Sequence, residues 1–441
     1  MPKWITKSFL VLLVLGVGYV LTVQVLRAIA FGEEEQAALA LIEPLPPPPA
    51  GESGYKYLGF HSLDIPVGEL DDALAADLAA YREWHAGGAR RLLGKEFDGT
   101  YVSPLETKYP ARPVVTPPEA ECALRETDCL GKLRGHEQAM RGWLQQEAAR
   151  LDLAWRALGA DHLANPYPLA ADSPIAGFQI LRLPLNDISL QALEGDVPGA
   201  LDRACGLLAA ERRFLRQDGL LIDKMVHGAL LDGASALVLA LRRADPAAPL
   251  PEGCAEAFAP VEATDFLACG AFRHEHEMVA TLSRQLEQGD GAGWSPGPWL
   301  RRLTMTDERL MRAWNAQHFV PLCSDEGQAA ILAGDVPAPT GGQTPWLSVD
   351  FLAAPISRIL ADIALPSYDQ YQNRLLDHAA SLRLHLAALA VLDGRLPAAD
   401  VPTAAASPGY TLTVEDGHWV LPLRAPQANR APDLRIAIPQ P

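Results

Sequence analysis

The chain has 441 residues and is 49% hydrophobic, so it can bury a sizeable core and is not disordered as a whole. Its 54 acidic residues outnumber its 37 lysines and arginines. The resulting formal net charge of -17 argues against nucleic-acid binding, because phosphate backbones attract clustered cations. The length allows roughly two to four domains.

The first feature along the chain is an uncharged apolar run from Phe9 to Leu26. At about 1.5 Å per residue, this run nearly spans a hydrocarbon core of about 30 Å. Lys3 and Lys7 precede the run and a group of glutamates follows it. The positive-inside rule therefore predicts a cytoplasmic tail over residues 1–7, a transmembrane signal anchor over residues 8–30, and an exported body.

A cleaved signal peptide is the alternative interpretation, because Ala28-Ile29-Ala30 resembles a signal-peptidase site. The long apolar run and Arg27 beside that site favour an uncleaved anchor. Alanine is abundant and arginine outnumbers lysine, as is typical of a GC-rich bacterial genome. We therefore expect a single-pass bacterial inner-membrane protein whose N-terminus is cytoplasmic and whose bulk faces the periplasm.

Residues 31–56 are predicted to form a Pro-rich linker. The run from Glu43 to Gly51 contains consecutive prolines, and such a stiff segment is expected to hold a folded domain away from the bilayer. Beyond it, the pattern predicts an α-helical periplasmic domain over residues 57–365. A C-terminal helix and β-hairpin over residues 366–441 are expected to pack on that same domain.

The fold class predicted after the anchor is mostly α, an irregular multi-helix domain with a small C-terminal β-hairpin. Apolar residues recur at helical spacing in residues 67–93, 130–158, 175–217, 220–243, 264–288, 299–318 and 368–392. Alternating runs at Tyr410–Val414 and His418–Leu423 flank Asp416-Gly417, which is a hairpin signal.

Within this series, residues 176–216 are predicted to form a helical hairpin that resembles a tetratricopeptide repeat. The resemblance rests on the Gly195-Asp196 turn after the first helix and on the small Ala200, which lets the second helix pack closely. It does not recur at the repeat period. An ordinary antiparallel hairpin is therefore favoured over a solenoid, which needs about three units.

The order of short tail, anchor, Pro-rich spacer, paired cysteines, helices and terminal hairpin resembles uncharacterised single-pass inner-membrane-anchored periplasmic proteins of proteobacteria. The resemblance covers the organisation of the chain and carries no catalytic motif. It therefore implies a cellular location and a membrane anchor, and no specific activity.

The even number of cysteines is consistent with disulfides in an exported body. The disulfide candidates are Cys122, Cys129, Cys205, Cys254, Cys269 and Cys323. Cys122 and Cys129 would close a short loop, and Cys254 and Cys269 are the next nearest pair in the sequence. Cys205 and Cys323 would then remain. Spacing alone cannot choose among the alternatives. The absence of any CxxC motif disfavours a zinc site.

The polar-site candidates are His274 and Glu277, which share a helix face. His274 and His276 diverge by about 200° around a helix, so a metal site is not expected, and neither is a cofactor. Ser235 lies in a helical pattern without the final glycine of a nucleophile elbow. His227 is interpreted as a core histidine, and tryptophans after residue 290 as core residues or the walls of a groove.

These patterns favour a non-enzymatic binding, scaffold or envelope-assembly accessory protein. Its expected partners are the inner membrane, through the N-terminal helix, and other envelope proteins. One alternative is an envelope hydrolase whose site is built from dispersed residues, which predicts a cleft with converging His, Asp, Glu or Ser side chains. Another is an immunity protein against a delivered toxin, whose acidic face would suit a basic partner.

Overall fold

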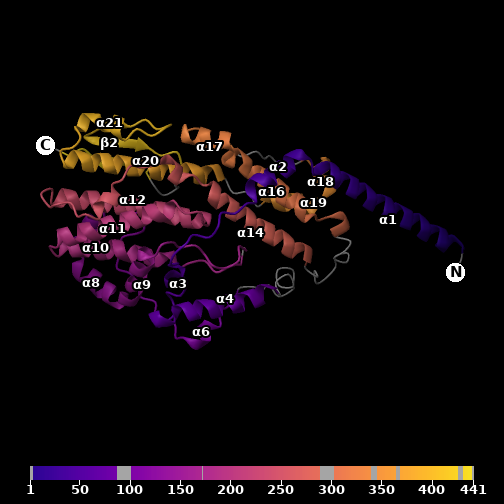
Figure 1. The fold of residues 1–441 in the computed structure, drawn as a ribbon, viewed down its shortest axis with the longest axis horizontal. Helices are drawn as coiled ribbons and strands as arrows, with labels where there is room; N and C mark the ends of the chain where they lie inside the picture. The colour runs from indigo at the N-terminus through magenta and orange to yellow at the C-terminus, as the bar shows by residue number, and fades with distance from the viewer. Residues whose placement is uncertain are drawn as a thin grey trace.

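The computed structural model describes residues 3–86, 101–170, 172–288, 302–338, 345–363, 368–425 and 431–439 (Figure 1). Its helices are α1 (Lys3–Ala30), α2 (Glu33–Ile42), α3 (Tyr55–Gly59), α4 (Leu70–Ala86), α6 (Leu105–Lys108), α7 (Cys129–Leu133), α8 (Glu137–Gln146), α9 (Ala148–Gly159), α10 (Leu183–Leu193), α11 (Val197–Leu215), α12 (Leu221–Ala244), α13 (Cys254–Ala257), α14 (Cys269–Gln288), α16 (Glu308–Cys323), α17 (Asp325–Leu332), α18 (Val349–Ala353), α19 (Pro355–Ile363), α20 (Tyr368–Leu392) and α21 (Val401–Ala404). The strands are β1 (Thr413–Glu415), β2 (His418–Pro422) and β3 (Asp433–Ala437). The mostly helical fold class is confirmed.

The body is organised around the long helices α11, α12 and α20, which pack side by side in that order (Figure 1). Helices α12 and α20 are long and apolar enough to cross a membrane, but most of each is buried inside the body. Helix α1 is also long and apolar enough to cross a membrane, yet most of its large apolar side chains from Leu10 to Leu21 are exposed. Burial therefore separates the two core helices from the one helix that extends away from the body.

The C-terminal end of α1 packs against the body instead of ending free. Val23 and Ala30 are buried, and the buried Arg27 guanidinium donates hydrogen bonds to backbone carbonyls of the body. The alternative cleavage site, Ala28-Ile29-Ala30, lies within the last turn of this continuous helix. Cleavage there would remove a packed part of the fold.

The predicted linker over residues 31–56 differs from the observed structure, because its first part is a packed helix. Helix α2 buries Ala38 and Ile42 against α16, and Glu43 forms an ion pair with Arg312 of α16. Acidic residues fill the first turn of α2, where the helix dipole favours them. Because Ala38 and Ile42 are four residues apart, they lie on the same face of α2, and this face packs against α16. The prolines that follow, Pro44 to Pro49, lie outside any helix or strand and are exposed or half-buried.

The predicted helical hairpin is present as α10 and α11. Gly195 has a φ of +101°, a conformation that favours glycine, and the Asp196 side chain caps α11 by accepting a hydrogen bond from the Gly199 amide at 3.0 Å. Ala200 is fully buried between the two helices, as predicted. Elsewhere the helical periodicity predicts helices that are too long, since the single helix predicted over residues 130–158 is divided into α7, α8 and α9.

The C-terminal β-element is a three-stranded antiparallel sheet in the order β1-β2-β3, which corrects the predicted two-stranded hairpin. The turn at Asp416-Gly417 is present, with positive φ at both residues. In the β2–β3 register, Trp419 lies opposite Ile436, and both side chains are buried. Strand β3 is short and flanked by prolines, so the sequence gives only a weak signal for it.

Three disulfides join the six candidate cysteines, and one of them is the short-loop pair expected from the sequence. Cys122 pairs with Cys129 as predicted. Among the pairings that spacing left open, Cys205 pairs with Cys254, with Cα atoms 4.9 Å apart, and Cys269 pairs with Cys323 at 5.1 Å, so the nearest-neighbour pairs Cys254–Cys269 and Cys205–Cys323 do not form. These distances arise because α13 packs on α11, and because the first residue of α14 meets the last residue of α16. Helix packing, not sequence spacing, selects these partners.

Candidate functional site

The predicted polar candidates, His274 and Glu277, are not brought together. His274 Nδ1 lies 2.8 Å from the Gly270 carbonyl oxygen of its own helix, and Glu277 forms an ion pair with Arg284. Among the described residues, no group of three or more His, Cys, Asp or Glu side chains could hold a metal ion. The neighbouring His276 is the buried histidine of this cluster, and its Nδ1 lies 2.8 Å from Asn315 Oδ1.

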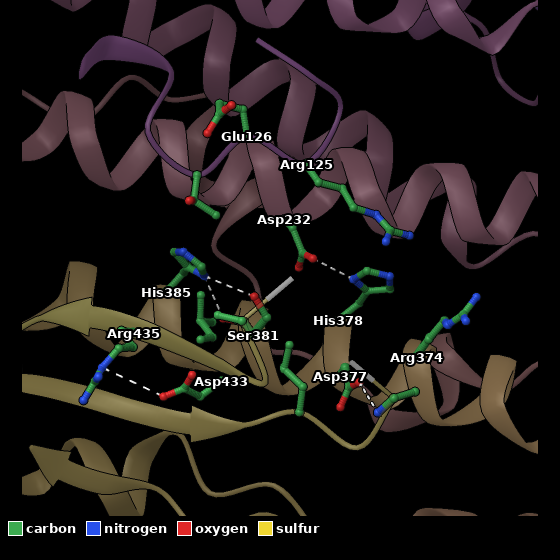
Figure 2. Close-up of a pocket in the computed structure, with 15 residues that line it drawn as sticks. Arg125, Glu126, Asp232, Arg374, Asp377, His378, Ser381, His385, Asp433 and Arg435 are labelled. Atoms are coloured by element: carbon green, nitrogen blue, oxygen red, sulfur yellow. Dashed lines mark hydrogen bonds and ion pairs between the residues drawn. The ribbon is translucent and has the colours of Figure 1, made fainter. Parts of the chain in front are cut away.

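A polar pocket of about 640 Å³ lies where four separate segments meet (Figure 2). They are the loop closed by the Cys122–Cys129 disulfide, α12, α20 and the C-terminal sheet. The pocket is lined by Arg125, Glu126, Thr127, Asp232, Arg374, Asp377, His378, Ser381, His385, Leu423, Ala425, Ala431, Asp433, Leu434 and Arg435. None of these residues is among the predicted site residues.

Two glycines of α12 allow its neighbours to approach closely. A Cβ atom on Gly233 would lie 2.7 Å from the Leu124 carbonyl oxygen of the disulfide loop. A Cβ atom on Gly228 would lie 2.4 Å from Cδ2 of the His378 ring. Glycine within a helix costs about 1 kcal/mol relative to alanine, so its presence twice on α12 is a sequence signal for close packing at this site.

The central interaction of the pocket is the contact between Asp232 of α12 and His378 of α20. Asp232 Oδ2 lies 2.9 Å from His378 Nδ1, and both side chains are buried. The other ring nitrogen of His378, Nε2, is buried without a hydrogen-bond partner, against Gly228. A general base must reach its substrate, and this nitrogen faces α12 instead of the pocket space.

Ser381 and His385 continue the same face of α20 but do not complete a catalytic triad. His385 Nδ1 lies 2.8 Å from the Ser381 carbonyl oxygen and 3.5 Å from Ser381 Oγ. In a triad, a single imidazole bridges the hydroxyl and the carboxylate, whereas here Asp232 contacts a different histidine. Burial lowers the pKa of His385, so this ring is neutral at pH 7.

Asp377 attaches the C-terminal sheet to α20. Its carboxylate accepts hydrogen bonds from the Tyr410 hydroxyl at 2.7 Å, the Arg424 amide at 2.9 Å and the Ala425 amide at 3.0 Å. These bonds fix the chain that leaves β2, and β2 pairs with β3, the strand that carries Asp433 and Arg435 at the pocket wall.

The arginines at the pocket differ in their partners. Arg435 pairs with Glu415 on the neighbouring part of the sheet and with Asp433 on its own strand. Arg374 lies over the Tyr371 ring at 5.1 Å and has no acidic partner within the described part of the chain. Arg125 and Arg374 lie on the His378 side of the pocket, whereas Asp433 and Arg435 lie on the opposite side (Figure 2). Arg374 therefore marks the place where the pocket can contact a negative group.

A second pocket, of about 560 Å³, lies between α3, α4 and the segment around Tyr167. Its buried Asp77 carboxylate accepts hydrogen bonds from the hydroxyls of Tyr101, Ser103 and Tyr167. Because three hydroxyls satisfy this carboxylate, its interactions hold segments of the fold together, and we regard the first pocket as the candidate site.

The other predicted positions are structural. His227 is buried, as expected, and its Nδ1 contacts Glu211 Oε2 at 2.6 Å. Ser235 donates a hydrogen bond to the Asp232 backbone carbonyl. Trp314 and Trp419 are fully buried and Trp346 is exposed, so they do not form a shared groove. The predicted helix start at Trp299 lies outside the described residues.

No protein-family model matches this chain, and no curated protein or solved structure is significantly similar to it. The site therefore has to be interpreted from its own geometry.

Proposed function

We propose that the chain is a single-pass inner-membrane protein that acts in the cell envelope by binding, without catalysis. In this proposal, α1 crosses the bilayer, residues 1–7 lie in the cytoplasm and the body faces the periplasm. The exposed apolar surface of α1, the lysines before it and three disulfides in the body support this arrangement.

The polar pocket is the proposed binding site, and its ligand is a charged segment of another envelope protein. The observation that most supports this proposal is that Arg374, a cation at the pocket, has no acidic partner in the described part of the chain. It lies on the same side of the pocket as Arg125 (Figure 2). An arginine fork suits a carboxylate of the partner. Because the lining comes from four segments, such a ligand would contact them all at once.

A hydrolase is the second candidate, and the Asp232–His378 contact is the observation in its favour. The buried Nε2 of His378 and the separation of this pair from Ser381 count against it. If the pocket hydrolysed a substrate through this pair, Asp232→Asn would remove activity while leaving binding in place. For a binding protein, Arg374→Ala is the damaging substitution.

Site-specific photocrosslinking in cells tests the proposal. A photoreactive amino acid replaces Thr127, an exposed residue at the pocket, or Arg82, an exposed residue on the distant α4 (Figure 1). We expect one discrete protein adduct from position 127 and none from position 82. Arg374→Ala should remove the adduct and Arg374→Lys should weaken it. An adduct that is indifferent to Arg374, or no adduct at position 127, would contradict a binding role for the pocket.

A further inference from the structure

Residues 346–359 expose a set of large apolar side chains beside the base of α1. Trp346 is 78% exposed and Leu347 is 87% exposed, and both directly precede α18. The set comprises Trp346, Leu347, Val349, Leu352 and Ile359, and is called the α18–α19 apolar surface. Exposure of this extent is costly in water unless a partner covers these side chains.

This surface belongs to a two-sided segment that is firmly attached to the body. The opposite side of α18 and α19 buries Ala353, Ala354 and Ala361 in a small core with Trp314. The backbone amide of Ile356 donates a hydrogen bond to the Met305 carbonyl, and Met305 is itself 37% exposed beside the segment. The exposed apolar side chains are therefore held on a fixed support.

The position of α18 along α1 identifies what can cover the surface. Arg27 of α1 donates a hydrogen bond from Nε to the Ala353 carbonyl at 3.0 Å, and α18 packs along α1 (Figure 1). The uncharged part of α1 lies between Lys7 and Arg27, and at about 1.5 Å per residue it matches a hydrocarbon core of about 30 Å. The outer boundary of that core then falls close to Arg27, at the level of α18.

We propose that the α18–α19 apolar surface contacts the lipid bilayer, so that the body rests on the membrane that α1 crosses. Tryptophan is favoured at the boundary between headgroups and acyl chains, which suits Trp346 at the start of this segment. Because α18 packs on the end of α1, the bilayer that covers the exposed apolar side chains of α1 would lie next to this surface. The inference rests on the proposed membrane anchor, and it assigns a second, interfacial contact to the body.

The test uses the full chain in phosphatidylcholine vesicles whose acyl chains carry a bromine quencher. The native cysteines are all in disulfides, so a polarity-sensitive fluorophore can be attached to one introduced cysteine. The variants are Leu347→Cys in the proposed surface, Val114→Cys as a matched control that is 95% exposed on the body, and Leu15→Cys within α1. We expect the labels at 347 and 15 to shift their emission to shorter wavelength and to lose intensity with brominated lipid. The label at 114 should do neither.

The outcomes separate the two proposals. Quenching at 15 without quenching at 347 would overturn the membrane-contact surface and leave the anchor intact. No quenching at 15 would overturn the anchor and, with it, this inference. Equal quenching at 347 and 114 would indicate non-specific adsorption of the body and would also overturn the assigned surface.

Discussion

The attachment of α1 to the body depends on Arg27, and replacing it with methionine should loosen that attachment. The Arg27 guanidinium donates to the carbonyl oxygens of Ala353 at 3.0 Å, Arg302 at 2.8 Å and Thr306 at 2.7 Å. It also lies 3.6 Å from the Asp307 carboxylate. Methionine keeps the length of the aliphatic stem but removes the charge and every donor.

The size of the effect follows from these contacts. A hydrogen bond to a charged group contributes about 1.5–3 kcal/mol, and removing one partner of a buried charged pair costs about 3–5 kcal/mol. The three bonds share one side chain, so we take about 4 kcal/mol for Arg27→Met. Since about 1.4 kcal/mol corresponds to a factor of ten, undocking of α18 from α1 should become about 10³-fold more frequent.

Hydrogen exchange on the detergent-solubilised full chain measures this undocking. The backbone amides of Leu352 and Ala354, which bond within and beside α18, should lose protection in Arg27→Met. Arg156→Met is the matched control, because Arg156 makes only an exposed ion pair with Asp152, which contributes little to stability. If α18 exchanged at the wild-type rate in Arg27→Met, the argument that Arg27 couples α1 to the body would be refuted.

The remaining predictions concern the body. Replacing Cys205 and Cys254 together by alanine should lower the free energy of unfolding by about 4 kcal/mol in urea titrations, because their disulfide closes a long loop; an unchanged midpoint would refute this. Burial lowers the pKa of Lys224 to about 8, below the unfolded value of about 10.4, so the unfolded state holds the proton more tightly. Wild type should therefore gain about 2.5 kcal/mol of stability relative to Lys224→Met as pH rises from 8 to 10.4, and a pH-independent difference would contradict the burial of this ammonium. Asp377→Asn should expose the chain after residue 405 to limited proteolysis without unfolding α20. The asparagine amide has one acceptor oxygen in place of two, so it cannot accept all three hydrogen bonds that Asp377 accepts. An unaltered cleavage pattern would show that other contacts hold the sheet.

Local patterns predicted local structure well. The uncharged run predicted the exposed helix α1, and the Gly195-Asp196 turn predicted the hairpin of α10 and α11, because both depend on residues close in sequence. The Cys122–Cys129 bond was predictable for the same reason. The sequence did not predict helix α2, because the prolines at residues 44–49 led us to assign all of residues 31–56 to a linker. The acidic residues in the first turn of α2 are nevertheless a helix signal.

Features that depend on tertiary packing were not predictable from spacing. Cys254 is closer in sequence to Cys269 than to Cys205, yet the packing of α13 on α11 determines its partner. The candidate pocket joins Asp232 to His378 across two helices that are far apart in sequence. Only Gly228 and Gly233 gave a local sign of it, because a glycine inside a helix often marks a close approach.

The central claim is that the body is exported and oxidised on the outer side of the membrane that α1 crosses. Peptide mass mapping under non-reducing conditions, on the chain isolated from bacterial membranes with thiols blocked at lysis, tests it most directly. We expect the linkages Cys122–Cys129, Cys205–Cys254 and Cys269–Cys323 in the membrane fraction. Six blocked free thiols would contradict export of the body.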